Sequence, residues 1–267
     1  MGQNIYGVDI GTSNFKMCCK DKDKIINEKN IIAIANKKDI LAFGDEAYEM
    51  YEKAPEHIEV SFPVKFGVIA DIENMQTLLL RFFNKMNDDK KFTGNTDFYI
   101  AVPTDVTEVE KRAFYELVAD SKVKAKNIYI VDKPVADAIG AGLDVTKSKG
   151  IMIVNIGAET TEISVLSLGG IVISKSVKIG GNKLDDSIIS AVRKVYNLII
   201  GSKTAEGLKK ELGSAVQAEE TFAPGFGRNV LSGLPVSVDI SSDVIYSAVV
   251  DPLHSIICLL YTSPSPR

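Results

Sequence analysis

A short motif that occurs twice constrains the fold of this chain more than any other feature. The sequence YGVDIG spans residues 6–11, and MIVNIG spans residues 152–157. Each motif has three residues, then a short polar side chain, Ile and Gly, and each leads through a polar turn into another strand-like run. A long-range repeat of this kind is typical of an internal duplication. We therefore expect two domains built on one plan, facing each other across a cleft, with one turn from each domain in the cleft.

Strand-like and helix-like segments alternate through the first half of the chain. A helix is predicted where apolar residues recur at helical spacing, namely at Ile72, Met75, Leu79, Phe82 and Met86. A second helix is expected to begin at Thr107, because Glu110 three residues later completes a capping box. A third, rich in small residues, spans 134–142. Strands are predicted at residues 5–10, 15–20, 25–35, 98–102 and 127–131. This order predicts an α/β sheet of mixed direction.

The polar stretch KSKG at residues 147–150 is the predicted domain boundary. After it come strand-like runs at 151–156, 161–168 and 171–177, and a helix at 182–200. We expect a first domain at 1–148, with a small subdomain at about 33–67, and a second domain at 149–257. Residues 258–267 carry Pro264 and Pro266, which end any helix, and are expected to form a tail outside the pattern.

Composition excludes several classes of protein. The 31 Lys and Arg residues against 35 Asp and Glu residues give a net charge of −4, so no general positive charge predicts nucleic-acid binding. Three cysteines, two of them adjacent at Cys18 and Cys19, do not predict a disulfide framework or a thiolate zinc site. No secretion signal is recognised, and no apolar run of about 18 residues is expected to span a membrane. A soluble, cytoplasmic protein is expected.

The first turn has the groups that bind phosphate. Residues 9–14 offer backbone N–H groups, the hydroxyls of Thr12 and Ser13, and the carboxylate of Asp9 at the end of a strand. Such a set can surround phosphate oxygens while Asp9 holds a hydrated Mg²⁺ through water. An ordinary hairpin is the alternative for an isolated motif of this kind. The second copy of the motif favours the phosphate interpretation.

Several further motifs resemble MreB, the family of bacterial actins that organises rod shape. They are DIGT at residues 9–12, VPTDVTEVEKRA at 102–113, PVADAIGAG at 134–142, TTEISVLSLGGIV at 160–172, IGG at 179–181 and TAEGLKKELGSA at 204–215. The resemblance covers residues 4 to about 256. It implies an actin-like α/β fold, with two ribonuclease-H-like domains around a nucleotide cleft, the second domain being incomplete. It also implies ATP with Mg²⁺, self-assembly into filaments, and contact with the inner membrane surface and cell-wall synthesis proteins.

The resemblance assigns nucleotide-binding roles to particular positions. In the family, a first phosphate turn matches Asp9, Gly11, Thr12, Ser13 and Asn14, and a second matches Asn155, Gly157, Ala158, Glu159 and Thr160. The glutamate that orients the attacking water falls on Lys133. A glutamate and a lysine that hold adenosine match Glu206 and Lys209, whose spacing of three places them on one face of a helix.

The catalytic positions depart from the family pattern. Asn155 replaces an aspartate associated with the metal, Lys133 replaces the glutamate, and Ala158 and Glu159 replace glycines. The resulting site is less negative, so it needs a metal less and also holds Mg²⁺ less firmly. A lysine does not act as a general base at neutral pH unless its pKa is strongly lowered. We therefore predict impaired or lost hydrolysis with nucleotide binding retained.

Two alternatives remain open at this site. Lys133 and Glu159 either form an ion pair across the γ-phosphate position or are both solvated. Lys16 lies where eukaryotic actin has a lysine that contacts phosphate, or is simply a solvated lysine on a strand. For the whole protein, the alternative to a filament-forming MreB-like scaffold is an active ATPase with a rearranged catalytic site. A sugar kinase of the same superfamily has no recognisable sugar-binding aspartate.

Overall fold

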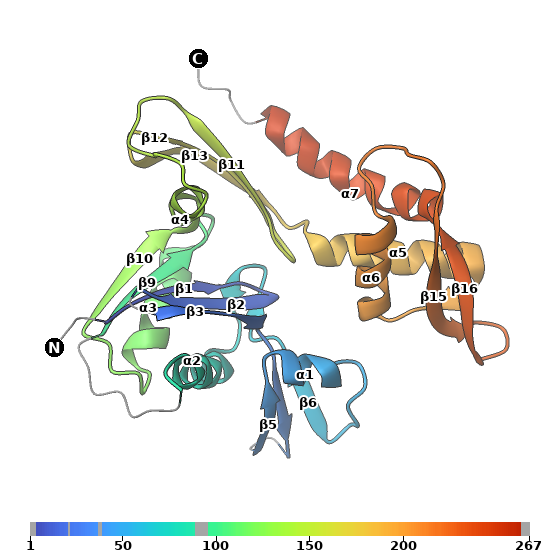
Figure 1. The fold of residues 1–267 in the computed structure, drawn as a ribbon, viewed down its shortest axis with the longest axis horizontal. Helices are drawn as coiled ribbons and strands as arrows, with labels where there is room; N and C mark the ends of the chain where they lie inside the picture. Colours follow the sequence, from blue (N-terminus) through green and yellow to red (C-terminus); the bar gives the residue numbers. More distant parts are fainter. Residues whose placement is uncertain (1–3, 21, 37–38, 89–95, 263–267) are drawn as a thin grey trace. The chain divides into compact units, whose positions relative to one another are not determined.

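The computed structural model describes residues 4–20, 22–36, 39–88 and 96–262 (Figure 1). The chain divides into two compact units. The first unit contains residues 1–157 and 162–176, and the second contains residues 158–161 and 177–267.

The helices and strands alternate along both units. The strands of the first unit are β1 (Asn4–Ile10), β2 (Asn14–Cys19), β3 (Lys22–Lys29), β4 (Ile32–Ala35), β5 (Asp39–Phe43), β6 (Ile58–Ser61), β7 (Val64–Lys65), β8 (Val68–Ile69), β9 (Thr96–Val102), β10 (Asn127–Asp132), β11 (Ile151–Ile156), and most of β12 (Thr161–Ser167) and β13 (Gly170–Val177). Its helices are α1 (Asp45–Met50), α2 (Ile72–Met86), α3 (Glu108–Ala119) and α4 (Lys133–Gly140). The second unit contains α5 (Gly181–Tyr196), β14 (Leu198–Ile199), α6 (Ser202–Leu212), β15 (Phe222–Asn229), β16 (Pro235–Ser241) and α7 (Ser242–Thr262).

A five-stranded sheet of mixed direction forms the centre of the first unit. Its strand order is β10-β9-β1-β2-β3. β1 pairs in parallel with β9, and β9 pairs in parallel with β10, whereas β2 and β3 follow as an antiparallel meander. This confirms the predicted mixed α/β sheet. Because β1, β9 and β10 run in parallel, their carboxyl ends meet at one edge of the sheet, where ligand sites of α/β folds commonly lie.

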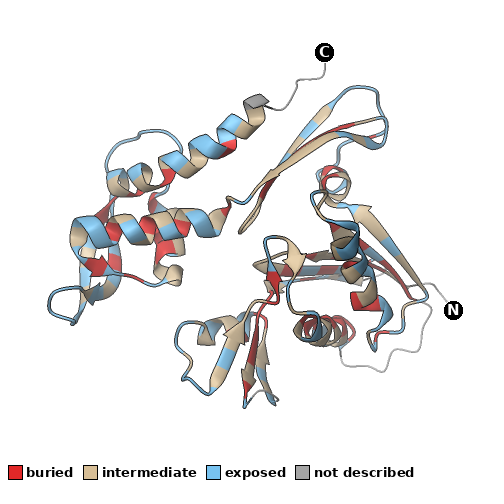
Figure 2. Ribbon diagram, turned by 180° about the vertical axis from the view of Figure 1, so that it is seen from behind, coloured by how far each residue is buried: buried red, intermediate tan, exposed pale blue. Residues whose placement is uncertain are grey.

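Helix α2 packs its apolar face on this sheet, as its sequence period predicts. Met75, Leu79, Phe82 and Met86 are fully buried, while Ile72 at the first turn is partly exposed. The ring of Phe82 stacks on Phe15 of β2 with centroids 4.5 Å apart. Buried residues of the central sheet and of α2 belong to one apolar core, and the ribbon of both carries buried positions in red (Figure 2). Thr107 and Glu110 form the predicted capping box at the start of α3.

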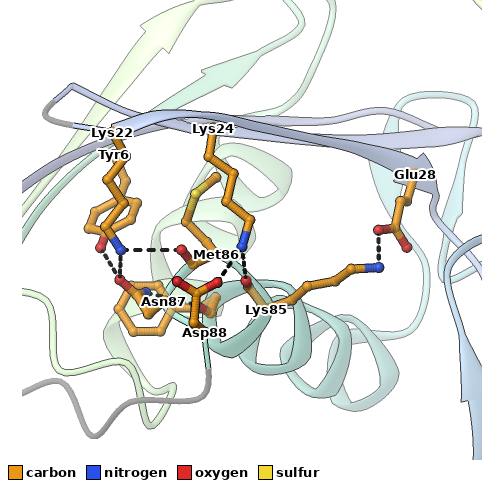
Figure 3. A network of polar contacts seen from close by, with 9 residues as sticks. Tyr6, Lys22, Lys24, Glu28, Lys85, Met86, Asn87 and Asp88 are labelled. Carbon is orange, nitrogen blue, oxygen red and sulfur yellow. Dashed lines mark hydrogen bonds and ion pairs between the residues drawn. The ribbon is translucent and has the colours of Figure 1, made fainter.

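A polar network joins the sheet to the end of α2 (Figure 3). The amide of Asn87 is at its centre: its Oδ1 accepts from the Tyr6 hydroxyl at 2.8 Å and from Lys22 Nζ at 2.7 Å. Its Nδ2 donates to the carbonyl of Phe83 at 2.7 Å. Beside it, Lys24 donates to the carbonyl of Lys85 at 2.7 Å. Lysines at a helix C-terminus satisfy carbonyls that have no partner within the helix, and they complement its dipole.

The single strand predicted at residues 25–35 is wrong, because the structure has two strands there. β3 ends at Lys29, and β4 begins at Ile32 in a different sheet of order β5-β4-β6. The break has a physical cause at Asn30, which is buried and donates both its backbone N–H and its side-chain amide to the turn after β1.

β11, β12 and β13 form a three-stranded sheet that groups with the first unit. Ala138 of α4 and Leu166 of β12 are fully buried in one cluster, to which Ile153 of β11 also belongs. Glu162 is buried and accepts hydrogen bonds from the backbone N–H of Thr104 and the hydroxyl of Ser174, each at 3.1 Å. The predicted boundary between residues 148 and 149 differs from this division, because side chains from both sides of it share one core.

The second unit has its own apolar core between α5, α6, α7 and the hairpin of β15 and β16. The helix predicted at residues 182–200 ends earlier, at Tyr196, because Asn197 adopts the left-handed conformation and β14 follows. α7 runs to Thr262, so part of the predicted tail at 258–267 is helical; residues 263–267 lie outside the described part of the chain.

The sequence predicted no segment that could span a membrane, and helix α7 departs from this prediction. Within the described residues, Ser242–Leu260 has the length and the apolar composition to do so. Core helices of soluble proteins can meet the same criteria. Ile245 and Val249 of α7 are buried in the core of the second unit.

Candidate functional site

The turn between β1 and β2 is tightly built. The N–H of Gly11 donates to the carbonyl of Asn14 at 3.0 Å and closes the turn. A Cβ atom at Gly11 would lie 2.8 Å from that same carbonyl oxygen, so only glycine fits here. Asn30 supports the turn, since its side-chain amide donates to the carbonyl of Gly11 at 2.9 Å and its N–H to the carbonyl of Ser13 at 2.8 Å. The conformation of the turn is therefore fixed by the fold itself.

The polar side chains of this turn also have partners. Thr12 Oγ1 accepts from the N–H of Gly67 at 3.1 Å, and Ser13 Oγ accepts from Lys29 Nζ at 3.2 Å. Asn14 Nδ2 donates to Asn27 Oδ1 at 3.1 Å. Both hydroxyls accept in these contacts, which leaves their own O–H groups able to donate to an anion.

Asp9 lies between two lysines. Its Oδ1 accepts from Lys133 Nζ at 2.7 Å and its Oδ2 from Lys16 Nζ at 3.1 Å. The sheet explains both contacts. Lys16 is directly opposite Asp9 in the antiparallel pairing of β1 and β2, where opposite charges attract across strands. Lys133 begins α4 immediately after β10, at the same sheet edge where β1 ends.

Burial and charge act in opposite directions on Asp9. Its partial burial would raise the pKa of its carboxyl group, but attraction and hydrogen bonds from Lys133, and then from Lys16, outweigh burial and lower the pKa below its usual value. The side chain of Lys133 is only 18% exposed and that of Asp9 22% exposed, so solvent screens this pair incompletely. Lys16 is 54% exposed and closer to an ordinary surface pair.

Asp137 belongs to the same cluster, and the sequence prediction missed it. It lies one helical turn after Lys133 on α4, and its Oδ2 accepts from Asn155 Nδ2 of β11 at 2.5 Å. Burial raises the pKa of Asp137, although the hydrogen bond from Asn155 and the charge of Lys133 oppose the rise. The spacing of Lys133 and Asp137 in the sequence was the available signal, because residues four apart share a helix face.

The cluster does not fit the Mg²⁺ site expected at Asp9. Both carboxylate oxygens of Asp9 accept from ammonium groups, and a divalent cation nearby would be repelled by them. The described residues contain no group of three or more His, Cys, Asp and Glu side chains that could hold a metal ion. The formal charges of Asp9, Asp137, Lys16 and Lys133 cancel, whereas Mg²⁺ sites in proteins are rich in carboxylate and other oxygen ligands.

The second turn follows β11 and connects it to β12. Gly157 ends the first unit's segment, and Ala158, Glu159 and Thr160 belong to the second unit. In that unit the carbonyl of Ala158 accepts from the N–H of Asn182 at 2.7 Å, at the start of α5. The ion pair of Lys133 in the structure is with Asp9; the pair of Lys133 with Glu159 stays a prediction.

The two residues predicted to hold adenosine both lie on α6. Lys209 Nζ contacts Asp185 Oδ1 of α5 at 2.8 Å and donates to the carbonyl of Gly181 at 3.1 Å. Glu206 pairs with Lys210 at 2.8 Å. Burial raises the pKa of Asp185 despite its contacts with Lys209. Lys209, one of the two residues predicted to hold adenosine, thus connects α6 to α5 through its contacts with Asp185 and Gly181.

Comparisons with known proteins agree with the resemblance seen in the sequence. The family described as MreB/Mbl protein matches residues 3–263. The chain is 35% identical over 263 residues to the cell shape-determining protein MreB of Escherichia coli strain K12, covering 96% of this chain and 75% of that protein.

Solved structures give the same result for the fold. The crystal structure of MreB5 of Spiroplasma citri bound to ADP is similar with a TM-score of 0.91 and 33% sequence identity, covering 99% of this chain and 80% of that one. A MamK double helical filament is similar in fold, with a TM-score of 0.79 and 21% identity over 98% of this chain and 79% of that one. The fold is therefore actin-like, and the chain belongs to the MreB/Mbl family.

Proposed function

We propose that this chain is a cell-shape-determining bacterial actin that binds ATP and assembles into filaments, with hydrolysis impaired or lost. Its family membership and the named activity of the E. coli relative support the cell-shape role. The ADP bound to the Spiroplasma protein and the filament formed by MamK support nucleotide binding and self-assembly. We further propose that it works in the cytoplasm at the inner membrane surface with cell-wall synthesis proteins, as the family resemblance implies.

The observation that carries the proposal is the ion pair of Lys133 with Asp9. The family places a water-orienting glutamate at position 133, and here the side chain is an ammonium donating to a carboxylate. An ammonium engaged in this way does not accept a proton from water. Asn155, which stands in place of the aspartate associated with the metal, donates its amide to Asp137. The side chains at the two positions where the family orients water and associates with the metal, Lys133 and Asn155, are therefore each bonded to an aspartate of this chain.

Phosphate release from ATP in excess MgCl₂ tests impaired hydrolysis. The unmodified chain is expected to release phosphate slowly, and restoring the family residue with Lys133→Glu to speed release by about a hundredfold, since a positioned base contributes at least that much. Lys122→Glu is the matched control: Lys122 is an exposed lysine outside the cluster, and its charge reversal should leave the rate unchanged. Equal rates of phosphate release for the unmodified chain and Lys133→Glu would refute the proposal that Lys133 impairs hydrolysis.

The same assay tests the predicted pair of Lys133 with Glu159. If the two charges act together at the phosphate, Lys133→Glu combined with Glu159→Gly should change turnover and ATP affinity more than Lys133→Glu alone. Identical values for the two variants would show that Glu159 has no part in the site.

One observation favours the second candidate, an active ATPase with a rearranged site. Asp137 is a carboxyl group with a raised pKa in the cluster that contains Lys133, and groups of this kind often act as general bases. In that case Asp137→Asn abolishes turnover, whereas under the main proposal it leaves a low rate unchanged.

A further inference from the structure

We infer that Lys16 and Lys133 together take the place of the divalent cation at the first phosphate turn, so that this chain binds the polyphosphate of a nucleotide without magnesium. The inference rests on the proposed nucleotide binding and specifies its cation requirement.

The first step concerns Asp9. In a site that uses magnesium, this carboxylate faces the waters around the metal. Here Oδ1 accepts from Lys133 at 2.7 Å and Oδ2 from Lys16 at 3.1 Å, so both oxygens already meet a cation. A magnesium ion beside Asp9 would also experience repulsion from two ammonium groups. The carboxylate therefore orients lysines in place of a hydrated metal.

The second step concerns the donors that remain. An ammonium group has three N–H donors, and each of these two lysines gives one to Asp9. Lys16 is opposite Asp9 on β2, the strand that begins at the end of the turn, and Lys133 lies on α4 beside the end of β1. Lysine binds phosphate as a compact point charge and needs no fixed fork geometry. Both ammonium groups are thus held next to the turn with donors available to an anion.

The third step concerns charge. The family pattern places several carboxylates near the phosphates, and a divalent cation reduces the repulsion between these two sets of negative charges. In this chain the formal charges of Asp9, Asp137, Lys16 and Lys133 cancel, and Asn155 is neutral. A polyphosphate approaching this cluster meets no excess of negative charge. No metal is needed to reduce repulsion between the cluster and the polyphosphate, and the two lysines attract the polyphosphate themselves.

Isothermal titration calorimetry with ATP, in excess EDTA and in excess MgCl₂, tests the inference. The dissociation constants are expected to agree within about threefold. Lys133→Met, which keeps length but removes charge, should weaken ATP binding in EDTA by at least about tenfold, and MgCl₂ should restore part of it because Asp9 is released to face a hydrated metal. Lys122→Met is the matched control and should behave as the unmodified chain does.

Asp9→Asn should change the affinity for ATP in opposite directions in a site that uses magnesium and in a site that uses lysines. In a metal site, loss of the carboxylate weakens binding. In a lysine site, it removes the anion that competes with phosphate for both ammonium groups, so the affinity for ATP in EDTA is retained or increased. Adenosine, which has no phosphate, should bind all of these variants equally. Circular dichroism of each variant establishes that it is folded.

The possible results separate the inference from the proposed function. ATP binding that requires MgCl₂ in the unmodified chain would overturn the inference and leave nucleotide binding intact. Loss of ATP binding in folded Asp9→Asn in EDTA would overturn it as well. Absence of ATP binding both in EDTA and in MgCl₂ would overturn the inference and the proposed nucleotide binding together.

Discussion

Asp9 shows how a single residue can couple charge to stability. Lys133 and Lys16 together overcome the effect of burial and lower its pKa below 3.8. A group whose pKa is depressed in the folded state contributes stability above its unfolded pKa, and this contribution is lost as the pH falls through the folded value. Asp9→Asn should therefore lower the free energy of unfolding by about 1–3 kcal/mol at pH 7, because Lys133 loses its carboxylate partner. The difference should shrink as the pH falls below 3.8.

Urea unfolding at a series of pH values measures this effect. Glu116→Gln is the matched control, since it removes a carboxylate from the exposed pair with Arg112 and should change stability by no more than about 0.5 kcal/mol. A loss of stability in Asp9→Asn that is the same at acid and neutral pH would contradict the assigned role of the ion pairs.

The sequence identified some members of this cluster and missed others for a physical reason. Asp9, Lys133 and Asn155 stood out because their residue types depart from or match a family pattern. The partner of Lys133 depends on the order of β1, β9 and β10, which brings the ends of distant strands together. Asp137 lies within the PVADAIGAG motif at residues 134–142, but the motif gave it no role, and its hydrogen bond with Asn155 shows that it belongs to the cluster. Residue types are visible in a sequence, whereas partners are set by topology.

At the scale of elements, the end of α2 depends on Asn87. This buried amide accepts from Tyr6 and Lys22 and donates to the carbonyl of Phe83 (Figure 3). Asn87→Ala removes the three side-chain hydrogen bonds of a buried amide, while the carbonyl of Phe83 keeps the backbone N–H of residue 87. A hydrogen bond contributes about 0.5–1.5 kcal/mol net, so we expect the free energy of unfolding to fall by about 2–4 kcal/mol in denaturant titrations.

Tyr6→Phe is the companion variant, since it removes only the hydroxyl and leaves Asn87 paired with Lys22. Its cost at neutral pH should be about 1 kcal/mol. Burial, with added repulsion from Cys19, raises the pKa of Tyr6 to about 12. Because the folded value lies above the unfolded one, stability is fully present below pH 10.0 and falls as the pH rises towards 12, and Tyr6→Phe removes this part of the fall. An Asn87→Ala loss no larger than that of Tyr6→Phe would contradict the network.

For the whole molecule, the repeated motif predicted two domains with one copy of the motif in each. The chain divides into two compact units, but both copies, residues 6–11 and 152–157, lie in the first unit. Local patterns in the sequence predicted β1, β2, β9, β10, the helix α2 and the capping box of α3, but they did not separate β3 from β4. Local patterns did not predict the division between units either, because it depends on which sheet shares a core with α4, and buried Ala138 and Leu166 lie far apart in sequence. The strands β14, β15 and β16 also escaped prediction. β14 has only two residues, and Pro224, Gly225 and Gly227 interrupt the apolar residues of β15. β16 does alternate apolar residues at Val236, Val238 and Ile240, and this signal was overlooked.

Filament assembly is the property of the whole molecule on which the proposal depends. If hydrolysis is impaired, the bound nucleotide stays a triphosphate, and nothing changes the filament after assembly. Sedimentation should therefore give equal amounts of pelleted protein with ATP and with the non-hydrolysable analogue AMPPNP, at early and late times.

Lys133→Glu, which restores the family glutamate, should pellet with AMPPNP but return to the supernatant over time with ATP. The reason is that the two nucleotide states differ in their affinity for the filament, so hydrolysis shifts the equilibrium between filament and free protein. Lys122→Glu should match the unmodified chain. Protein that stays in the supernatant with both nucleotides would refute assembly, and unmodified protein that redissolves only with ATP would refute impaired hydrolysis.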